Sequence, residues 1–73
     1  MKNLINSKIS DLGLEIAGGR GDGCFYFVDL KTDSSLNAPS VMVSAMEHLT
    51  LNQWRAEALY ALEEHLESLT YNH

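Results

Sequence analysis

The chain has 73 residues, of which 45% are hydrophobic and 21% charged, a composition typical of globular domains and unlike that of disordered chains. Ten acidic residues against five basic ones give a formal net charge of −5, which disfavours binding to the phosphates of nucleic acids. A chain this short forms a small core, so we expect a single domain over residues 1–73 and no elaborate catalytic cleft.

Features of the whole chain also predict its compartment. Cys24 is the only cysteine, so an intrachain disulfide cannot form, and this favours a reducing environment. The N-terminus contains no apolar run of signal-peptide length. No stretch approaches the roughly 18 apolar residues that indicate a membrane-spanning helix. We therefore expect a cytoplasmic protein that does not bind membranes.

The N-terminal third of the chain predicts a short helix followed by a strand. Apolar residues within 3–12 recur at helical spacing, and Gly13 follows where a cap glycine is common. Residues 14–17 alternate apolar and polar side chains, as a half-buried strand does. The glycine-rich residues 18–23 then predict a hairpin turn.

The middle of the chain predicts two further strands. Residues 24–30 are dense in aromatic and β-branched side chains, and residues 41–46 form a second such run. Between them, residues 31–39 contain turn-forming residues and the only proline, so we expect a loop. Because Tyr26 and Val28 lie opposite the phenylalanines of the central strand, either face could line the core. A sheet that is apolar on both faces would need covering on both, which the first and last helices could supply.

The last helix has the clearest boundary. Thr50 and Gln53 match a capping box, with Leu49 and Trp54 at the positions of a hydrophobic staple. An apolar stripe follows at helical spacing, and we expect it to face the sheet. Its members are Leu51, Trp54, Ala58, Leu62, Leu66 and Leu69, with Leu59 at the edge. The elements together predict an α+β fold of order α-β-β-β-α, in which a three-stranded antiparallel meander packs against the long C-terminal helix.

Two motifs in the glycine-rich segment have structural explanations. Arg20-Gly21-Asp22 spells the tripeptide by which extracellular ligands bind integrins, but glycine permits such a turn and polar residues solvate it. The segment also lacks the Lys-Ser/Thr pair of a phosphate-binding loop. A strand follows it where a phosphate site requires a helix N-terminus. We expect neither activity.

Residues with catalytic or metal-binding chemistry are not arranged as a site. His48, His65 and His73 show none of the spacings of zinc ligands. Cys24 is more typical of a small buried hydrophobe than of a reactive thiol. We therefore predict no catalytic residue, no metal site and no cofactor, and hence no enzyme.

Two surfaces of the last helix remain as candidates for binding a protein. The first is an acidic face around an aromatic residue, suited to a basic protein partner, with an ordinary solvated face as the alternative. Its residues are Glu57, Tyr60, Glu63, Glu64 and Glu67. The second is the series Leu59, Leu62, Leu66 and Leu69, whose 3-4-3 spacing matches helix pairing and would allow a homodimer. Its length is short for a coiled coil, so packing against the chain's own sheet is favoured.

Three segments resemble short uncharacterised open reading frames of bacteriophages and other mobile elements: residues 23–29, 38–43 and 48–54. The resemblance implies a phage or mobile-element accessory protein that acts on a host protein, and it carries no activity with it. Our leading hypothesis is a non-enzymatic interaction module, whose working surface would be the acidic face around Tyr60 or an exposed edge of the sheet. The alternatives are a self-associating structural homo-oligomer and, less favoured because five net charges are few for a duplex, a DNA mimic.

Overall fold

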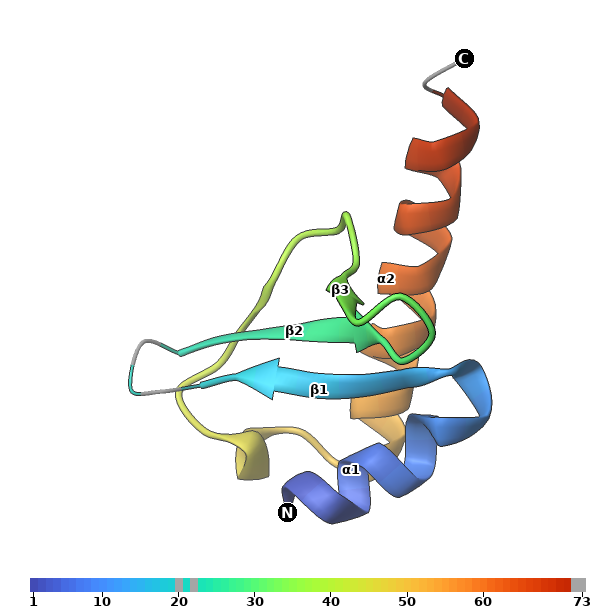
Figure 1. Cartoon of the computed structure of the whole chain (residues 1–73). Coiled ribbons are helices and arrows are strands. Elements are labelled where there is room, and N and C mark those ends of the chain that lie inside the picture. The colour runs from blue at the N-terminus through green and yellow to red at the C-terminus, as the bar shows by residue number, and fades with distance from the viewer. Residues whose placement is uncertain (20, 22, 72–73) are drawn as a thin grey trace.

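The fold is a small α+β arrangement in which a short N-terminal helix and a long C-terminal helix pack against an antiparallel sheet (Figure 1). The structure is a computed structural model that describes residues 1–19, 21 and 23–71. The elements in chain order are helix α1 (Lys2–Ile9), the short helical turn η1 (Ser10–Leu12), strands β1 (Leu14–Gly18), β2 (Cys24–Asp29), β3 (Ser34–Ser35) and β4 (Val41–Met42), the short helical turn η2 (Met46–His48) and helix α2 (Leu51–Tyr71). The predicted fold class is confirmed.

The N-terminal helical segment ends at the glycine that the sequence indicates. Gly13 has a left-handed backbone, with φ of 74°, and its N–H donates a hydrogen bond of 3.0 Å to the carbonyl of Ser10. A residue without Cβ adopts this conformation at little cost, so the chain can turn directly into β1. The Asn6 side chain joins the two elements, since its oxygen accepts a 2.8 Å hydrogen bond from the N–H of Ile16.

Strand β2 is the centre of the sheet. It pairs with β1 in antiparallel register, from Asp29 opposite Leu14 to Phe25 opposite Gly18. The turn between them needs its glycines, because a Cβ on Gly19, whose φ is 79°, would lie 2.2 Å from the Phe25 ring. On the other edge, β3 pairs near the end of β2 and β4 pairs near its beginning, both antiparallel.

The third strand of the expected meander is divided into two short strands, β3 and β4, which the sequence did not predict. The expected strand over 41–46 pairs only at Val41–Met42, and Ser34–Ser35, inside the expected loop, forms β3. Between them the chain leaves the sheet at a segment that includes Pro39, which has no N–H to donate to a ladder. The departure also places Leu36 in the core, with 7% of its surface exposed.

Both helices cover the same face of the sheet. Phe25 and Phe27 of β2 point to that face and are buried, whereas Tyr26 between them is exposed on the other. Of the two possibilities that the sequence leaves open, the structure thus has the phenylalanine face lining the core, and the opposite face is not covered by a helix. A single hydrophobic core forms instead, from Ile5, Ile9, Leu14, Ile16, Phe25, Phe27, Leu36, Trp54, Ala58 and Ala61.

The capping box at the start of α2 is confirmed. The N–H of Gln53 donates to the Thr50 hydroxyl oxygen at 3.1 Å, and the Gln53 side-chain oxygen accepts from the N–H of Thr50 at 2.8 Å. Two backbone donors that the first turn leaves unsatisfied are thus paired by side chains. This local geometry fixes where α2 begins and which residues of its first turns meet the core.

Candidate interaction surface on the C-terminal helix

The N-terminal half of α2 is anchored by Trp54. Its indole is fully buried and its N–H donates a 2.8 Å hydrogen bond to the carbonyl of Met46. The ring meets Phe25 edge-on at a centroid distance of 5.4 Å and Phe27 at 6.4 Å. Edge-to-face contacts of this kind add to the burial of the rings, so this residue fixes the helix to the sheet.

An ion pair adds a second attachment, between α2 and the end of the N-terminal helical segment. The Arg55 guanidinium donates two hydrogen bonds to the Asp11 carboxylate, of 2.7 and 3.0 Å, and one of 2.6 Å to the carbonyl of Lys8. The hydrogen bonds from Arg55 lower the pKa of Asp11. Because both side chains are accessible to water, the pair orients the two helices more than it stabilises them.

The C-terminal half of α2 extends past the sheet. Figure 1 shows α2 crossing the strands steeply and continuing beyond β3 toward the C-terminus. With 21 residues and about 1.5 Å per residue, α2 is about 31 Å long. A sheet three strands wide spans only about 10 Å from its first to its third strand. The sheet is therefore too narrow to cover the whole helix.

The loop between β3 and β4 supports one side of this projecting half. The backbone N–H of Asn37 donates a 2.9 Å hydrogen bond to Nδ1 of His65, and the Asn37 side-chain amide donates to the Ser68 hydroxyl. His65 is half-buried at this contact. The support holds the helix from one side.

The open side carries leucines. We call Leu59, Leu62, Leu66 and Leu69 the leucine face. Leu59, Leu66 and Leu69 are 45%, 53% and 57% exposed, whereas Leu62 is half-buried against the edge of the core. The prediction that the apolar stripe faces the sheet is therefore right for its first turns and wrong for these three leucines.

The buried side of α2 only partly coincides with the predicted stripe. Among the described side chains of α2, Trp54, Ala58 and Ala61 are buried. The backbone of α2 comes closest to α1, whereas Trp54 reaches the strands through its ring contacts with Phe25 and Phe27. The spacing of four and then three residues continues to the half-buried His65. Trp54 and Ala58 were members of the predicted stripe, and Ala61 was not, because the larger leucines gave the stronger apolar signal.

A hollow lies along the leucine face. Its lining residues are Leu59, Leu62, Glu63, Leu66, Glu67 and Thr70. All six belong to α2, so the hollow is the space between side chains of one helix and has no opposing wall. Its floor is mainly apolar, and two carboxylates border it.

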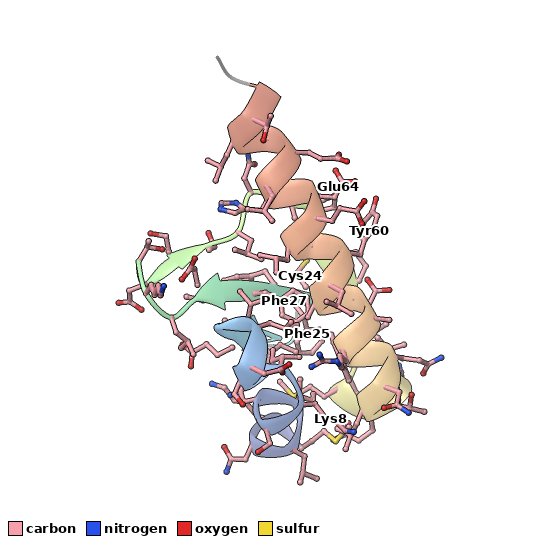
Figure 2. The ribbon with its side chains drawn as sticks, turned by 90° about the vertical axis from the view of Figure 1, so that its right-hand side faces the viewer. Lys8, Cys24, Phe25, Phe27, Tyr60 and Glu64 are labelled. Carbon is pink, nitrogen blue, oxygen red and sulfur yellow. The ribbon has the colours of Figure 1, made fainter. Side chains whose placement is uncertain are left out.

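The predicted acidic face gathers around Tyr60, which is 54% exposed. The negative charge of Glu64 is the main cause that raises the pKa of the Tyr60 hydroxyl; partial desolvation, a hydrogen bond to Glu64, and the charges of Glu57 and Glu63 raise it further. Figure 2 shows Tyr60 and Glu64 on the same side of α2. The tyrosine hydroxyl thus stays protonated at neutral pH and can donate a hydrogen bond.

The five predicted residues divide into two overlapping groups. Glu57, Glu63 and Glu64 act on Tyr60 through their charges, whereas Glu63 and Glu67 also line the hollow beside the leucines. The helical period suggests that the glutamates project away from the leucines, but this second pair lies beside them. The acidic face and the leucine face are therefore adjacent parts of one surface.

The other residues considered from the sequence lie apart from this surface. The Cys24 thiol donates to the Met42 sulfur at 3.3 Å, on the sheet face that the helices leave uncovered, and His48 lies 3.0 Å from the Ser44 hydroxyl. Arg20 and Asp22 of the tripeptide, and His73, lie outside the described residues.

Searches of the described part of the chain for two further features were negative. No group of three or more potential metal ligands comes together there. Within the same residues, no helix is both long and apolar enough to span a membrane.

Comparisons of the chain with protein-family models, with curated proteins and with solved structures gave no match. The surface of α2 is therefore interpreted from its own residues.

Proposed function

We propose that this chain is a non-enzymatic protein-interaction module that binds its partner with the projecting half of α2. One observation carries the proposal: three leucines of α2 are about half exposed or more. They do not serve to attach the helix, which is held to the fold by Trp54 and by the hydrogen bond from Asn37 to His65. Contiguous exposed apolar side chains on a small protein are typical of an interface. The adjoining Tyr60 and glutamates favour a partner with a polar, positively charged rim.

The free energy at stake supports a binding role. Complete burial of a leucine side chain is favourable by about 1.5–3 kcal/mol, so covering the remaining half of three leucines would contribute several kcal/mol to an association. A chain of this size has little such surface to spare, since its own core is small. The exposed leucines of α2 stay outside that core although the helix itself is attached to the fold. A binding partner explains their position better than a role in folding does.

The chemistry of the surface favours binding over catalysis. The groups on α2 are leucines, carboxylates open to water and a tyrosine whose pKa is raised, so the tyrosine is a hydrogen-bond donor and a poor base. Such groups complement another surface. An accessory protein of a phage or mobile element that acts on a host protein, as the resemblance implies, would use a module of this kind.

The test is capture of the partner from the organism that encodes the chain, with immobilised wild-type and variant proteins. We expect Leu66→Ser and Tyr60→Ala each to reduce capture while leaving the thermal melt nearly unchanged. Leu4→Ser is the matched control, because Leu4 on α1 is 56% exposed and lies outside the leucine face. Equal capture by Leu66→Ser, Tyr60→Ala and the wild type would refute the proposal.

The second candidate is self-association through the same leucines, which the 3-4-3 spacing and exposure of the leucine face favour. Light scattering over a range of concentrations separates the two. A monomer at high micromolar concentration eliminates a homo-oligomer, whereas a dimer that Leu66→Ser dissociates would replace the first candidate. A DNA mimic ranks third, because leucines occupy the part of the surface where a mimic would need more charge.

A further inference from the structure

We infer that the partner seated on the leucine face is a basic amphipathic helix. The inference rests on the proposed function and names the chemistry of the partner for that same surface. Three properties of the hollow carry it: its shape, the spacing of its lining residues and the position of its charges.

The shape of the hollow fits a helix better than a small molecule. Small-molecule sites are concave and bury most of the ligand, which requires walls on several sides. Here every lining residue comes from α2, so a small ligand would be covered from one side only. A second helix laid along α2 needs no opposing wall, because it supplies its own side chains to fill the hollow.

The lining residues have the spacing of two helix-packing holes. Each side chain that projects from one paired helix enters a hole formed by four residues of the other, at positions i, i+3, i+4 and i+7. Leu59, Leu62, Glu63 and Leu66 form one such set, and Glu63, Leu66, Glu67 and Thr70 form the next. The two holes begin four residues apart, about 6 Å along α2, which matches two partner residues one turn apart.

The composition of each hole predicts the partner residue that fills it. The first hole has three leucines and one glutamate, so it favours an apolar side chain. The second is formed by Glu63, Leu66, Glu67 and Thr70, so two carboxylates and one leucine side chain line it. A lysine or arginine suits it, because the aliphatic stem can lie on the leucine while the charged end reaches the carboxylates. The partner helix would thus carry an apolar residue and, three or four positions away, a basic one.

The surrounding charge favours this partner over a second copy of the chain. Residues 56–70 contain four glutamates and no lysine or arginine, and the nearest basic residue of α2, Arg55, is already bonded to Asp11. Glu63 and Glu67 lie along one border of the leucine face, so two copies paired antiparallel through that face would bring these glutamates together. Like charges across an interface oppose association, whereas a basic helix would be attracted to the same carboxylates.

The test uses two synthetic helical peptides of equal length that share a leucine ridge and differ at one flanking position per turn, lysine in one and glutamate in the other. Fluorescence anisotropy measures their binding to the full chain. We expect the lysine peptide to bind at least tenfold, or about 1.4 kcal/mol, more tightly, and its affinity to fall as salt rises. Leu66→Ser should abolish binding, and Glu63→Gln/Glu67→Gln should weaken it about fivefold.

The matched control is Glu15→Gln/Glu47→Gln, which changes the net charge by the same amount at sites outside α2 and should leave binding unchanged. Equal affinity for the two peptides, or an equal effect of the two double variants, would overturn the basic partner. So would self-association that competes with the peptide and strengthens with salt, because the occupant would then be a second copy. If neither peptide binds while partner capture still depends on Leu66, the inference fails and the proposed function stands.

Discussion

The two halves of α2 belong to one continuous helix, yet they are built for different contacts. The first half buries Trp54 and alanines in the core and is held by an ion pair at its side. The second half presents leucines to solvent and is held by hydrogen bonds from one loop. Three large apolar side chains thus lie outside the core of a small chain. A helix that served only to complete the core would place those leucines within it.

The largest expected effects come from shortening one side chain to alanine in each half of α2 and comparing the stability of the two variants. We expect Trp54→Ala to destabilise the fold by about 3–5 kcal/mol, because it leaves a cavity between the helix and β2 and removes the bond to Met46. For a small domain this is enough to unfold much of the population.

The paired variant is Leu66→Ala, for which we expect a change within about 0.5 kcal/mol. Urea unfolding followed by tryptophan fluorescence serves for Leu66→Ala, and circular dichroism for Trp54→Ala, which lacks the fluorophore. A loss of more than about 2 kcal/mol for Leu66→Ala would mean that this leucine is packed in the monomer, and the contrast between the halves would collapse.

A smaller effect is expected from enlarging the helix where it is buried. Ala58 is fully buried in the core, so Ala58→Leu should cost about 1–3 kcal/mol by forcing α2 away from the elements packed against it. Ala56→Leu makes the same chemical change at an exposed position of the same half and should be nearly neutral. Thermal melts of the two variants measure the difference; equal melts would show that the core has room for a larger side chain at Ala58.

The smallest expected effect concerns the ion pair that accompanies the first half. The pKa of Asp11 is lowered in the fold by Arg55, so the native state favours the ionised carboxylate. Its contribution is complete above the ordinary aspartate pKa of 3.8 and disappears as the pH falls through the lowered value.

Melting temperatures between neutral pH and strongly acidic pH measure this contribution. Asp11→Asn should melt slightly below the wild type at neutral pH, and the difference should vanish in acid. The effect is small because the pair is exposed to water and screened. If the difference in melting temperature between Asp11→Asn and the wild type persisted unchanged in acid, the effect of the substitution would not be due to the charge of Asp11.

Local signals in the sequence predicted much of the fold. The Thr50 and Gln53 cap, the Gly13 turn and the apolar alternation of β1 and β2 depend on neighbours a few residues away, so pattern and residue type suffice to find them. The strands on the other edge of β2 were harder to predict, because pairing at Ser34–Ser35 is set by the length and path of the chain around Pro39. Short strands of two residues have little pattern of their own.

The sequence indicates which residues of the candidate site share a side of α2, but not how the helix lies on the fold. Periodicity places Tyr60 and the glutamates on one side of α2, and the structure gathers three of those carboxylates around the tyrosine. Periodicity cannot tell which part of a broad apolar stripe is buried, since that depends on how α2 packs against the rest of the core and on how wide the sheet is. The exposure of the leucine face follows from those two tertiary facts.

The bonds from Asn37 to His65 and Ser68 have a consequence for the rate and cost of recognition. The last turns of an unsupported helix fray, and a partner would then have to order them on contact. Here a loop that belongs to the sheet holds those turns in helical form before any encounter. The entropy of ordering these turns is lost during folding, so a partner of the proposed kind would bind turns that are already helical and would lose less affinity to ordering.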